Sequence, residues 1–414
     1  MGLDDLLAHQ RMTRPALLEK QRRDLAAIVR FAADNTDYYR DRFAGLDLRD
    51  CAPEELPLLT KEDIAANLDA LLARGARDRA MIGHTGGSTG RPTAFWYDEA
   101  KHALMRAGMA RSYMMSGWRP GQRIVNFWGA ARDIGAGGVF DNTATERTLP
   151  AQQHDEATLA GWAETLRSYR PALLQGYASI LAELARFVVD TRQKMPDSLI
   201  GVYSTAETLD GRQRELMERA FSCKVFNQYG SREIPNIACE CRHGNMHVFT
   251  DMVWLESLAS DGEDRLVVTS LTNRLMPMIR YDIGDCGQLS GRLNEGDCAC
   301  GSPFPLMEMG LCRKNDLIRT TDGRRIHPST FNRLLYGMAQ VRQYQWIQTA
   351  PDRIVLNVVA SPALGPEIAD LLREGIRRDV DARMAFELNH VEEIARTASG
   401  KHRFVIAWGG LVLL

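Results

Sequence analysis

The segment HTGGSTGRP, residues 84–92, places six small or hydroxyl residues in a row before an arginine and a proline. Glycines let the backbone curl, so that successive N–H groups and hydroxyls can converge on one anion. Such a loop suits a polyphosphate, although no Lys-Ser/Thr pair follows as in a Walker A motif. The alternative is a flexible surface loop. The candidate phosphate-binding residues are Thr85, Gly86, Gly87, Ser88, Thr89 and Gly90.

Two short clusters, ACECRHGNMH at 238–247 and DCACG at 297–301, hold four cysteines and two histidines. Thiolate and imidazole groups brought together by two hairpins are what a closed tetrahedral Zn²⁺ site needs. The spacing is C-x-C rather than the C-x-x-C of a zinc knuckle, and the alternative is a set of unligated buried thiols. A closed site has no open position, so such a zinc would be structural. The open ligand candidates in the first cluster are Cys239, Cys241, His243 and His247.

The bulk properties limit the class of protein that carries these segments. At 414 residues the chain exceeds the ~250 to 300 residues that one hydrophobic core supports, so two or more domains are expected. A formal charge of −2 gives no global field for nucleic acid or an anionic membrane. The N-terminus lacks the apolar core of a signal peptide, and no segment approaches the ~20 apolar residues of a membrane span. We therefore expect a cytoplasmic small-molecule enzyme with no nucleic-acid or membrane partner.

The elements that must position these residues follow from the apolar periodicity. Residues 1–45 predict two amphipathic helices that end near Phe43. From about residue 122, short apolar runs alternate with helical stretches, which predicts a mostly parallel sheet covered by helices. After residue 245 the pattern is that of antiparallel strands, and from about Cys312 it is that of a small α+β unit.

The predicted fold class is therefore α/β. We expect a large N-terminal body of mixed, mostly parallel sheets packed with helices plus a β-rich subdomain, residues 1–311, and a small α+β C-terminal domain, residues 312–414. Ligands bind at the carboxyl ends of the strands in such sheets.

Four separated segments occur in a fixed order: TGGSTGRP at 85–92, YGSRE at 229–233, RYDIGD at 280–285 and RTASGK at 396–401. In this order they resemble the signature segments of the adenylate-forming superfamily of acyl-CoA synthetases, adenylation domains and luciferases. Within it, the chain is most similar to the phenylacetate–CoA ligase family and the related deazaflavin coenzyme synthetases. The resemblance covers nearly the whole chain and implies ATP-dependent activation of a carboxylate, with a mobile C-terminal domain that rotates between two half-reactions.

The resemblance assigns Glu233 to Mg²⁺, Asp285 to the ribose hydroxyls and Tyr229 to stacking on adenine. A carboxylate suits a hard cation, and its two oxygens can accept from two hydroxyls. Lys401 would bridge the substrate carboxylate and the α-phosphate. Without the resemblance, Glu233 and Lys401 would be read as solvated residues and Asp285 as part of a turn. The remaining predicted nucleotide-binding residues are Ser204, Ala206, Glu207, Gly230 and Ser231.

The segment CRKNDLI resembles the GRxDDxI boundary of the superfamily. Arg313 and Asp316 match it, whereas Cys312 replaces the glycine and Asn315 the first aspartate. The altered hinge implies an altered second step. The predicted catalytic residues are Lys401, Glu233 and Arg313.

Position in the family also indicates the zinc ligands and the acid pocket. The expected ligands are Cys241, His243, Cys298 and Cys300, with His247 structural. The segments FWGAARDIGAGGVF and GYAS are expected to line a pocket for a flat aromatic acid, the alternative being ordinary core packing. The predicted pocket residues are Trp128, Ile134, Gly135, Tyr177 and Ala206.

The leading prediction is a ligase that uses ATP and Mg²⁺ to adenylate an aromatic carboxylic acid and passes the acyl group to coenzyme A. One alternative delivers it to an acyl-carrier protein, an amine or a hydroxyl. Another binds the nucleotide or the acid without turnover, and retention of Glu233, Asp285 and Lys401 together argues against it. A homodimer stays an open option.

Overall fold

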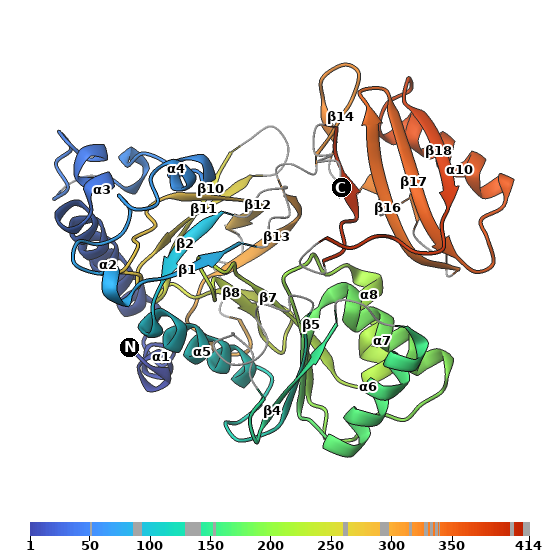
Figure 1. Ribbon diagram of the computed structural model, residues 1–414, viewed down its shortest axis with the longest axis horizontal. Helices are drawn as coiled ribbons and strands as arrows, with labels where there is room; N and C mark the ends of the chain where they lie inside the picture. The colour runs from blue at the N-terminus through green and yellow to red at the C-terminus, as the bar shows by residue number, and fades with distance from the viewer. Residues whose placement is uncertain are drawn as a thin grey trace.

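The computed structural model describes residues 1–49, 52–85, 93–128, 142–151, 155–259, 264–289, 298–313, 317–326, 330–331, 334–335, 338, 340–397 and 401–408. They form an N-terminal body up to residue 313 and a C-terminal body from residue 317, lying side by side (Figure 1). The first is built on an eleven-stranded sheet and the second on a four-stranded sheet. The predicted α/β class, with a larger mixed sheet and a smaller α+β unit, is confirmed.

Helices open the chain where the apolar periodicity predicts them. The sequence predicts two helices up to Phe43, and the structure has three because Thr36 interrupts the run. Its hydroxyl accepts a hydrogen bond from the Tyr39 N–H (3.2 Å) and so begins a new helix. The N-terminal α-helices are α1 (Leu3–His9), α2 (Arg14–Asn35), α3 (Asp37–Arg42) and α4 (Lys61–Ala66), with 3₁₀ turns at Pro53–Glu55 and Arg77–Arg79.

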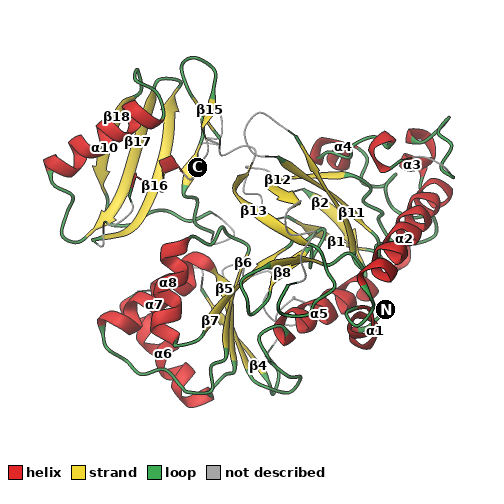
Figure 2. Cartoon of the chain, turned by 180° about the vertical axis from the view of Figure 1, so that it is seen from behind, coloured by secondary structure: helices red, strands yellow, loops and turns green. Residues whose placement is uncertain are grey.

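The parallel half of the large sheet follows the predicted alternation of strand and helix. Its strands are β3 (Ile124–Trp128), β4 (Glu146–Pro150), β5 (Leu173–Tyr177), β6 (Gly201–Thr205) and β7 (Lys224–Tyr229). The helices are α5 (Glu99–Met114), α6 (Glu156–Tyr169), α7 (Ala178–Asp190) and α8 (Gly211–Phe221). Helices α6, α7 and α8 cover one face and α5 lies toward the other (Figures 1 and 2). Because both faces are covered, β5 is buried throughout, and its sequence is mostly apolar.

The antiparallel half continues the same sheet. Its strands are β8 (Ala238–Glu240), β9 (Met246–Val248), β10 (Val253–Leu258), β11 (Arg265–Ser270), β12 (Tyr281–Leu289) and β13 (Leu306–Arg313). The strand order is β10-β11-β12-β13-β9-β8-β7-β6-β5-β3-β4. A separate hairpin pairs β1 (Met81–His84) with β2 (Ala94–Tyr97).

The large sheet is strongly curled. Strand β12 is four steps from β7 in the strand order, which is about 19 Å in a flat sheet. Yet the Tyr229 hydroxyl at the end of β7 lies 3.1 Å from Oδ2 of Asp285 on β12. Two side chains cannot span a flat sheet over that distance, so the antiparallel half must fold back over the carboxyl ends of the parallel strands.

The segment after the first 3₁₀ turn is held against this curled half. Leu59 donates its N–H to the carbonyl of Arg280 (3.0 Å) and accepts from the N–H of Asp282 (2.9 Å). The guanidinium of Arg280 is buried against Glu256 at 2.9 Å and donates to the carbonyl of Leu56. Residues 56–59 are thus fixed by residues that come much later in the chain.

A buried ion pair joins α5 to the turn before β10. Arg111 and Asp251 are fully buried, and Nη1 of Arg111 lies 2.6 Å from Oδ2 of Asp251. The guanidinium also lies over the ring of Phe249 at 4.0 Å, and His9 of α1 contacts the same carboxylate at 3.1 Å. These contacts fasten α1 and α5 to the antiparallel half.

The C-terminal body has its own core, which includes Trp346, Phe331 and Ile376. Its sheet has the order β18-β17-β16-β19. The elements are β14 (Ile318–Arg319), β15 (Arg325–Ile326), β16 (Val341–Ala350), β17 (Arg353–Ala360), α10 (Pro366–Asp379), β18 (Ala385–His390) and β19 (Val405–Ile406). The predicted boundary between residues 311 and 312 falls inside β13 and stays a prediction. Among the described residues, no helix is long and apolar enough to cross a membrane.

Candidate functional site

The predicted phosphate loop connects β1 and β2, and its two ends, Thr85 and Thr93, are hydrogen-bonded to each other. Thr85 and Thr93 exchange two hydrogen bonds of 2.9 Å, one between main-chain groups and one from the Thr93 N–H to the Thr85 hydroxyl. Arg232 of the YGSRE segment donates to the carbonyl of His84 (3.0 Å) and so ties the next motif to this hairpin. The tip, Gly86, Gly87, Ser88, Thr89 and Gly90, lies outside the described residues.

The loop after β7 is tightly folded. A Cβ on Gly230 would lie 2.8 Å from the main-chain nitrogen of Asn236, so only glycine fits there. The Ser231 N–H donates to the carbonyl of Ile234 (2.9 Å), and the Ile234 N–H donates to the Ser231 hydroxyl (3.0 Å). This packing holds Glu233, between them, in one place.

Glu233 is buried and is held from two sides. The Tyr281 hydroxyl donates to its Oε1 (2.9 Å), and the ammonium of Lys101 donates to its main-chain carbonyl (2.8 Å). Burial, and then the charge of Glu233, raise the pKa of Tyr281 far above its usual value, so the phenol stays a donor. Burial lowers the pKa of Lys101 to about 8 against the charges of Glu233 and Asp98. A buried carboxylate held by a neutral hydroxyl keeps lone pairs for a hard cation such as Mg²⁺.

Two predicted nucleotide residues meet at the fold-back of the sheet. The Tyr229 hydroxyl donates to Asp285 at 3.1 Å, so a phenol ring and a carboxylate lie next to each other where a nucleotide could contact both. The backbone of Arg313 on β13 pairs with Asp285 in the register of β12 and β13. The Arg313 side chain lies outside the description, and its catalytic role stays a prediction.

The end of β6 carries a strained turn. Ser204 is fully buried, and its hydroxyl has no hydrogen-bond partner among the described residues. Ala206 has a φ of 67°, a left-handed backbone conformation that costs a non-glycine residue about 1 kcal/mol. Glu207 does not project freely: Oε2 accepts from the Ser179 N–H (2.8 Å) and Oε1 from the His402 N–H (2.6 Å).

The predicted pocket residues that the structure describes lie close to one another and to Lys401. The rings of Trp128 and Tyr177 meet edge to face with centroids 4.7 Å apart, and Ala206 packs on the same apolar cluster. The Lys401 ammonium lies 6.0 Å from the centroid of the Tyr177 ring. The C-terminal body therefore brings Lys401 to the carboxyl ends of β3 and β5. Ile134 and Gly135 lie outside the described residues.

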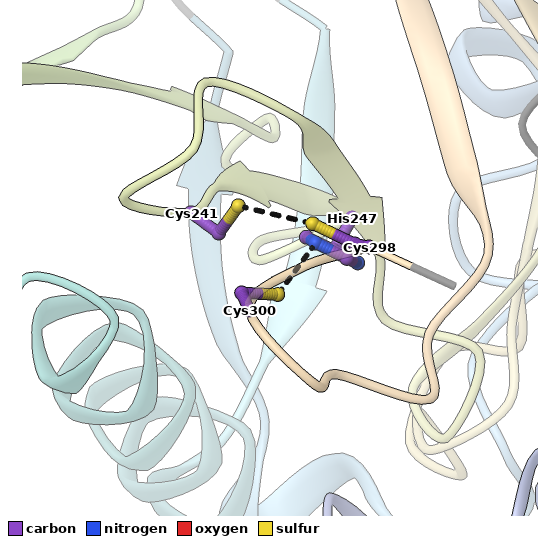
Figure 3. A group of neighbouring side chains, drawn as sticks. All are labelled: Cys241, His247, Cys298 and Cys300. Atoms are coloured by element: carbon purple, nitrogen blue, oxygen red, sulfur yellow. Dashed lines mark hydrogen bonds between the residues drawn. The ribbon is translucent and has the colours of Figure 1, made fainter. Parts of the chain in front are cut away.

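The cysteine clusters do come together, with a different histidine from the one expected. Cys241, His247, Cys298 and Cys300 offer ligand atoms that all lie within 4.8 Å of one another (Figure 3). The expectation that His243 completes the set and His247 is structural is wrong for this geometry. His243 is exposed on the turn, whereas His247 lies on β9 and its Nε2 is 3.3 Å from Sγ of Cys300.

The hydrogen bonds around this cluster suit metal-bound thiolates. The N–H groups of His243 and Ser302 donate to Sγ of Cys241 and Cys300, each at 3.4 Å, and the Asn245 amide donates to Sγ of Cys298 at 3.2 Å. Burial raises the pKa of Cys298, but the Asn245 bond and its neighbours leave it below the usual value. Nδ1 of His247 lies 3.0 Å from the carbonyl of Phe304; a carbonyl only accepts, so the proton sits on Nδ1 and Nε2 is free to ligate.

Sequence reasoning missed several residues of the site. Tyr281 lies inside the RYDIGD segment, and its buried position beside Glu233 was not signalled by the motif. Lys101 comes from a segment with no chemical pattern, and Asn245, although inside the first cysteine cluster, is not itself a metal-ligand type. His247 was visible in the sequence as the second histidine of the first cluster, but it was expected to be structural.

The sequence comparisons agree with this architecture. Residues 318–407 match the family described as the CapK C-terminal domain. Protein CapK of Staphylococcus aureus is 24% identical over 421 residues, covering 94% of this chain and 89% of that protein. A phenylacetate-coenzyme A ligase of Thermus thermophilus is 25% identical over 355 residues, covering 80% of this chain and 77% of that protein.

Solved structures share the fold over nearly the whole chain. 2-Hydroxyisobutyryl-CoA ligase in the postadenylation state, in complex with R3-HIB-AMP, has a TM-score of 0.72 at 18% identity and covers 96% of this chain and 91% of that chain. The same enzyme in the thioesterification state has a TM-score of 0.59 at the same coverage. The curled sheet with its C-terminal body is thus the fold that 2-hydroxyisobutyryl-CoA ligase also has. In sequence the chain is also similar to phenylacetate-coenzyme A ligases.

Proposed function

We propose that this protein is an AMP-forming ligase that activates a carboxylic acid with ATP and transfers the acyl group to coenzyme A. One observation carries the proposal: Lys401 of the C-terminal body lies over Tyr177 at the carboxyl end of β5, and the Tyr229–Asp285 pair lies at the carboxyl end of β7 in the same sheet. The similarity to phenylacetate-coenzyme A ligases supports coenzyme A as the acceptor. An acyl-carrier protein, an amine or a hydroxyl remains the alternative.

The first half-reaction is a substitution at phosphorus. An oxygen of the substrate carboxylate attacks the α-phosphorus of ATP, the bond to the β-phosphate oxygen breaks, and pyrophosphate leaves. Lys401 would offset charge on the carboxylate and the α-phosphate, and Asp285 would accept from the ribose. Glu233 would hold Mg²⁺, which, when bound, neutralises charge on the phosphates. In the second half-reaction the thiol sulfur attacks the acyl carbon, AMP leaves and the thiol proton is released.

The acid is proposed to be aromatic and to carry a polar substituent. The edge-to-face pair of Trp128 and Tyr177 supports a flat apolar ring near Lys401. Two buried polar side chains lie on strands of the same parallel half, β3 and β7: Oδ1 of Asn126 and Nε2 of Gln228 have no hydrogen-bond partner among the described residues. Leaving such groups unpaired costs about 1–3 kcal/mol each, and a hydroxyl can satisfy either one.

We also propose that Cys241, His247, Cys298 and Cys300 bind a structural Zn²⁺. Three thiols and one imidazole within 4.8 Å match a closed tetrahedral site. The amide-to-sulfur hydrogen bonds and the fixed histidine proton support it. With four protein ligands, such an ion has no position left for substrate.

The function is tested by pyrophosphate exchange over a panel of aromatic acids, with and without coenzyme A. The panel pairs each acid with its ring-hydroxylated analogue; we expect the hydroxylated member to react faster and Asn126→Leu to reduce that preference. If none of the acids in the panel supports pyrophosphate exchange, adenylation of an aromatic acid is contradicted. Exchange without thioester formation would favour the alternative acceptors.

Lys401→Ala separates the two half-reactions. Adenylation should slow by roughly 100-fold or more, about 3 kcal/mol for one preorganised charge contact. Thioester formation from a supplied acyl-adenylate should stay near wild type. An equal loss of rate in both half-reactions would mean that Lys401 stabilises the fold and not the transition state of adenylation.

A further inference from the structure

The start of α7 lacks a cap of its own. Its N-cap residue, Tyr177, makes no side-chain capping hydrogen bond, and no acidic residue lies in the first turn. The first N–H groups of a helix need acceptors, and a carboxylate there is favoured by the helix dipole. Glu207, from the turn after β6, supplies one: its Oε2 accepts from the Ser179 N–H at 2.8 Å.

The other oxygen of the same carboxylate reaches into the C-terminal body. Oε1 of Glu207 accepts from the main-chain N–H of His402 at 2.6 Å. His402 follows Lys401 directly, so the bond fixes the backbone next to the predicted catalytic lysine. One carboxylate thus joins the uncapped helix of the N-terminal body to the lysine segment.

A second contact to the start of α7 comes from Arg396, which precedes Lys401 in the chain. Arg396 donates to the Ser179 hydroxyl at 2.7 Å and forms an ion pair with Glu183 at 2.5 Å. Glu183 also accepts from Gln343 of β16 at 3.1 Å. Arg396 and Glu183 are 15% and 24% exposed, so solvent screens the pair less than it would a surface pair.

The segment between the two contacts is braced internally. The Lys401 N–H donates to the Thr397 hydroxyl (3.1 Å), and the Thr397 N–H donates to the Lys401 carbonyl (2.9 Å). Arg396 is bonded to Ser179 and Glu183 of α7, and the His402 N–H is bonded to Glu207, so the chain on both sides of Lys401 is held to the N-terminal body. The Lys401 ammonium is carried to the Tyr177 ring, which immediately precedes the same helix.

We propose that Glu207 and the Glu183–Arg396 pair form a docking latch that selects the domain arrangement in which Lys401 faces the adenylation site. Glu207 is then a positioning residue and not a nucleotide ligand, since both of its oxygens are used by main-chain N–H groups. The inference rests on the proposed function only for its kinetic consequence. The latch contacts exist in this arrangement of the two bodies, so their loss penalises adenylation and leaves the thioester step unaffected.

The kinetic test compares Glu207→Ala, Arg396→Glu and the swap Glu183→Arg/Arg396→Glu. Each single change should slow acyl-adenylate formation by roughly 5- to 150-fold, the usual range of a coupling between sites. Thioester formation from supplied acyl-adenylate should stay within about twofold, and the swap should recover most of the loss of Arg396→Glu. The affinity of Glu207→Ala for AMP should stay within about twofold as well; a large loss of AMP affinity would make Glu207 a nucleotide ligand and overturn the proposal.

A readout independent of chemistry keeps the latch testable if no acid reacts. Hydrogen exchange of the full chain should show faster exchange at Ser179 and in residues 401–402 of Glu207→Ala, with the core of each body unchanged. The matched control is the swap Glu164→Arg/Arg167→Glu, an ion pair of the same type at 2.6 Å within α6. Unchanged exchange at Ser179 and His402 in Glu207→Ala overturns the latch, whatever the catalytic result. Equal slowing of both half-reactions overturns it too.

Discussion

The phenolic hydroxyl of Tyr281 donates a 2.9 Å hydrogen bond to Oε1 of Glu233, joining two motif segments from different halves of the curled sheet. The bond leaves Oε2 as the oxygen that is not used by Tyr281. It also fixes the direction in which Glu233 presents its charge, as outer partners commonly do for metal-binding carboxylates.

Tyr281→Phe should therefore weaken the response to Mg²⁺ while keeping the fold. We expect the Mg²⁺ concentration for half-maximal pyrophosphate exchange to rise roughly tenfold, because loss of an outer partner typically costs 10–100-fold in metal affinity. Tyr169→Phe, which removes an exposed hydroxyl bonded to the Ala144 carbonyl, is the control. An unchanged Mg²⁺ titration for Tyr281→Phe would separate Tyr281 from the metal site.

Elemental analysis should find about one zinc per chain in protein purified without added metal. His247→Ala should abolish that zinc and lower the thermal midpoint, whereas His243→Ala, on the exposed turn of the same cluster, should do neither. Comparison of the zinc content of these two variants shows which histidine is the ligand. Full zinc content in His247→Ala would exclude the proposed ligand set.

The buried pair of Arg111 and Asp251 should be costly to break. Arg111→Met leaves a fully buried carboxylate without its cation, so the free energy of unfolding should drop by about 3–5 kcal/mol. Arg167→Met, which breaks an exposed pair in α6, should cost about 0.5 kcal/mol or less. Denaturant titration of both variants measures the difference. Similar values for the two would mean that burial does not decide the energy of the pair.

His402 should make the C-terminal body sensitive to acid. Burial lowers the pKa of His402; Glu207, Glu183 and a bond to the Tyr344 carbonyl oppose the shift, and Arg396 adds to it. The unfolded chain then takes up the proton first, at about pH 6.5, so stability is complete above that pH and is lost as pH falls toward the lower native pKa.

Calorimetry of wild type and His402→Gln at pH 7.5 and 5.5 measures this effect. Glutamine keeps an N–H donor for the Tyr344 carbonyl and does not titrate, so the variant should lose less stability between the two pH values than wild type. Equal losses would assign the acid sensitivity to other groups.

The sequence predicted the parallel half of the sheet well because short apolar runs such as β5 alternate with stretches of helical periodicity such as α7. It could not predict the choice of His247. Position in the family indicated His243, but metal binding needs a side chain that faces the second cluster. That direction is set by the pairing of β9 with β8 and β13, which joins segments far apart in the chain. The contacts of Glu207, which the sequence placed at the nucleotide, could not be predicted for the same reason, since its partners Ser179 and His402 are far from it in the chain.

The pairing of Leu59 with residues 280 and 282 has a consequence for biosynthesis. As the chain leaves the ribosome, residues 56–59 emerge long before the strand against which they are held. Until β12 is made, the apolar side chains of Leu56 and Leu59 have no permanent cover. The N-terminal helices therefore stay partly assembled, with apolar side chains that chaperones can bind, until β12 is made. Helices α6 to α8 and their strands can pack earlier, because their contacts are local in the chain. The contact between Tyr229 of β7 and Asp285 of β12 therefore cannot form before β12 has been made.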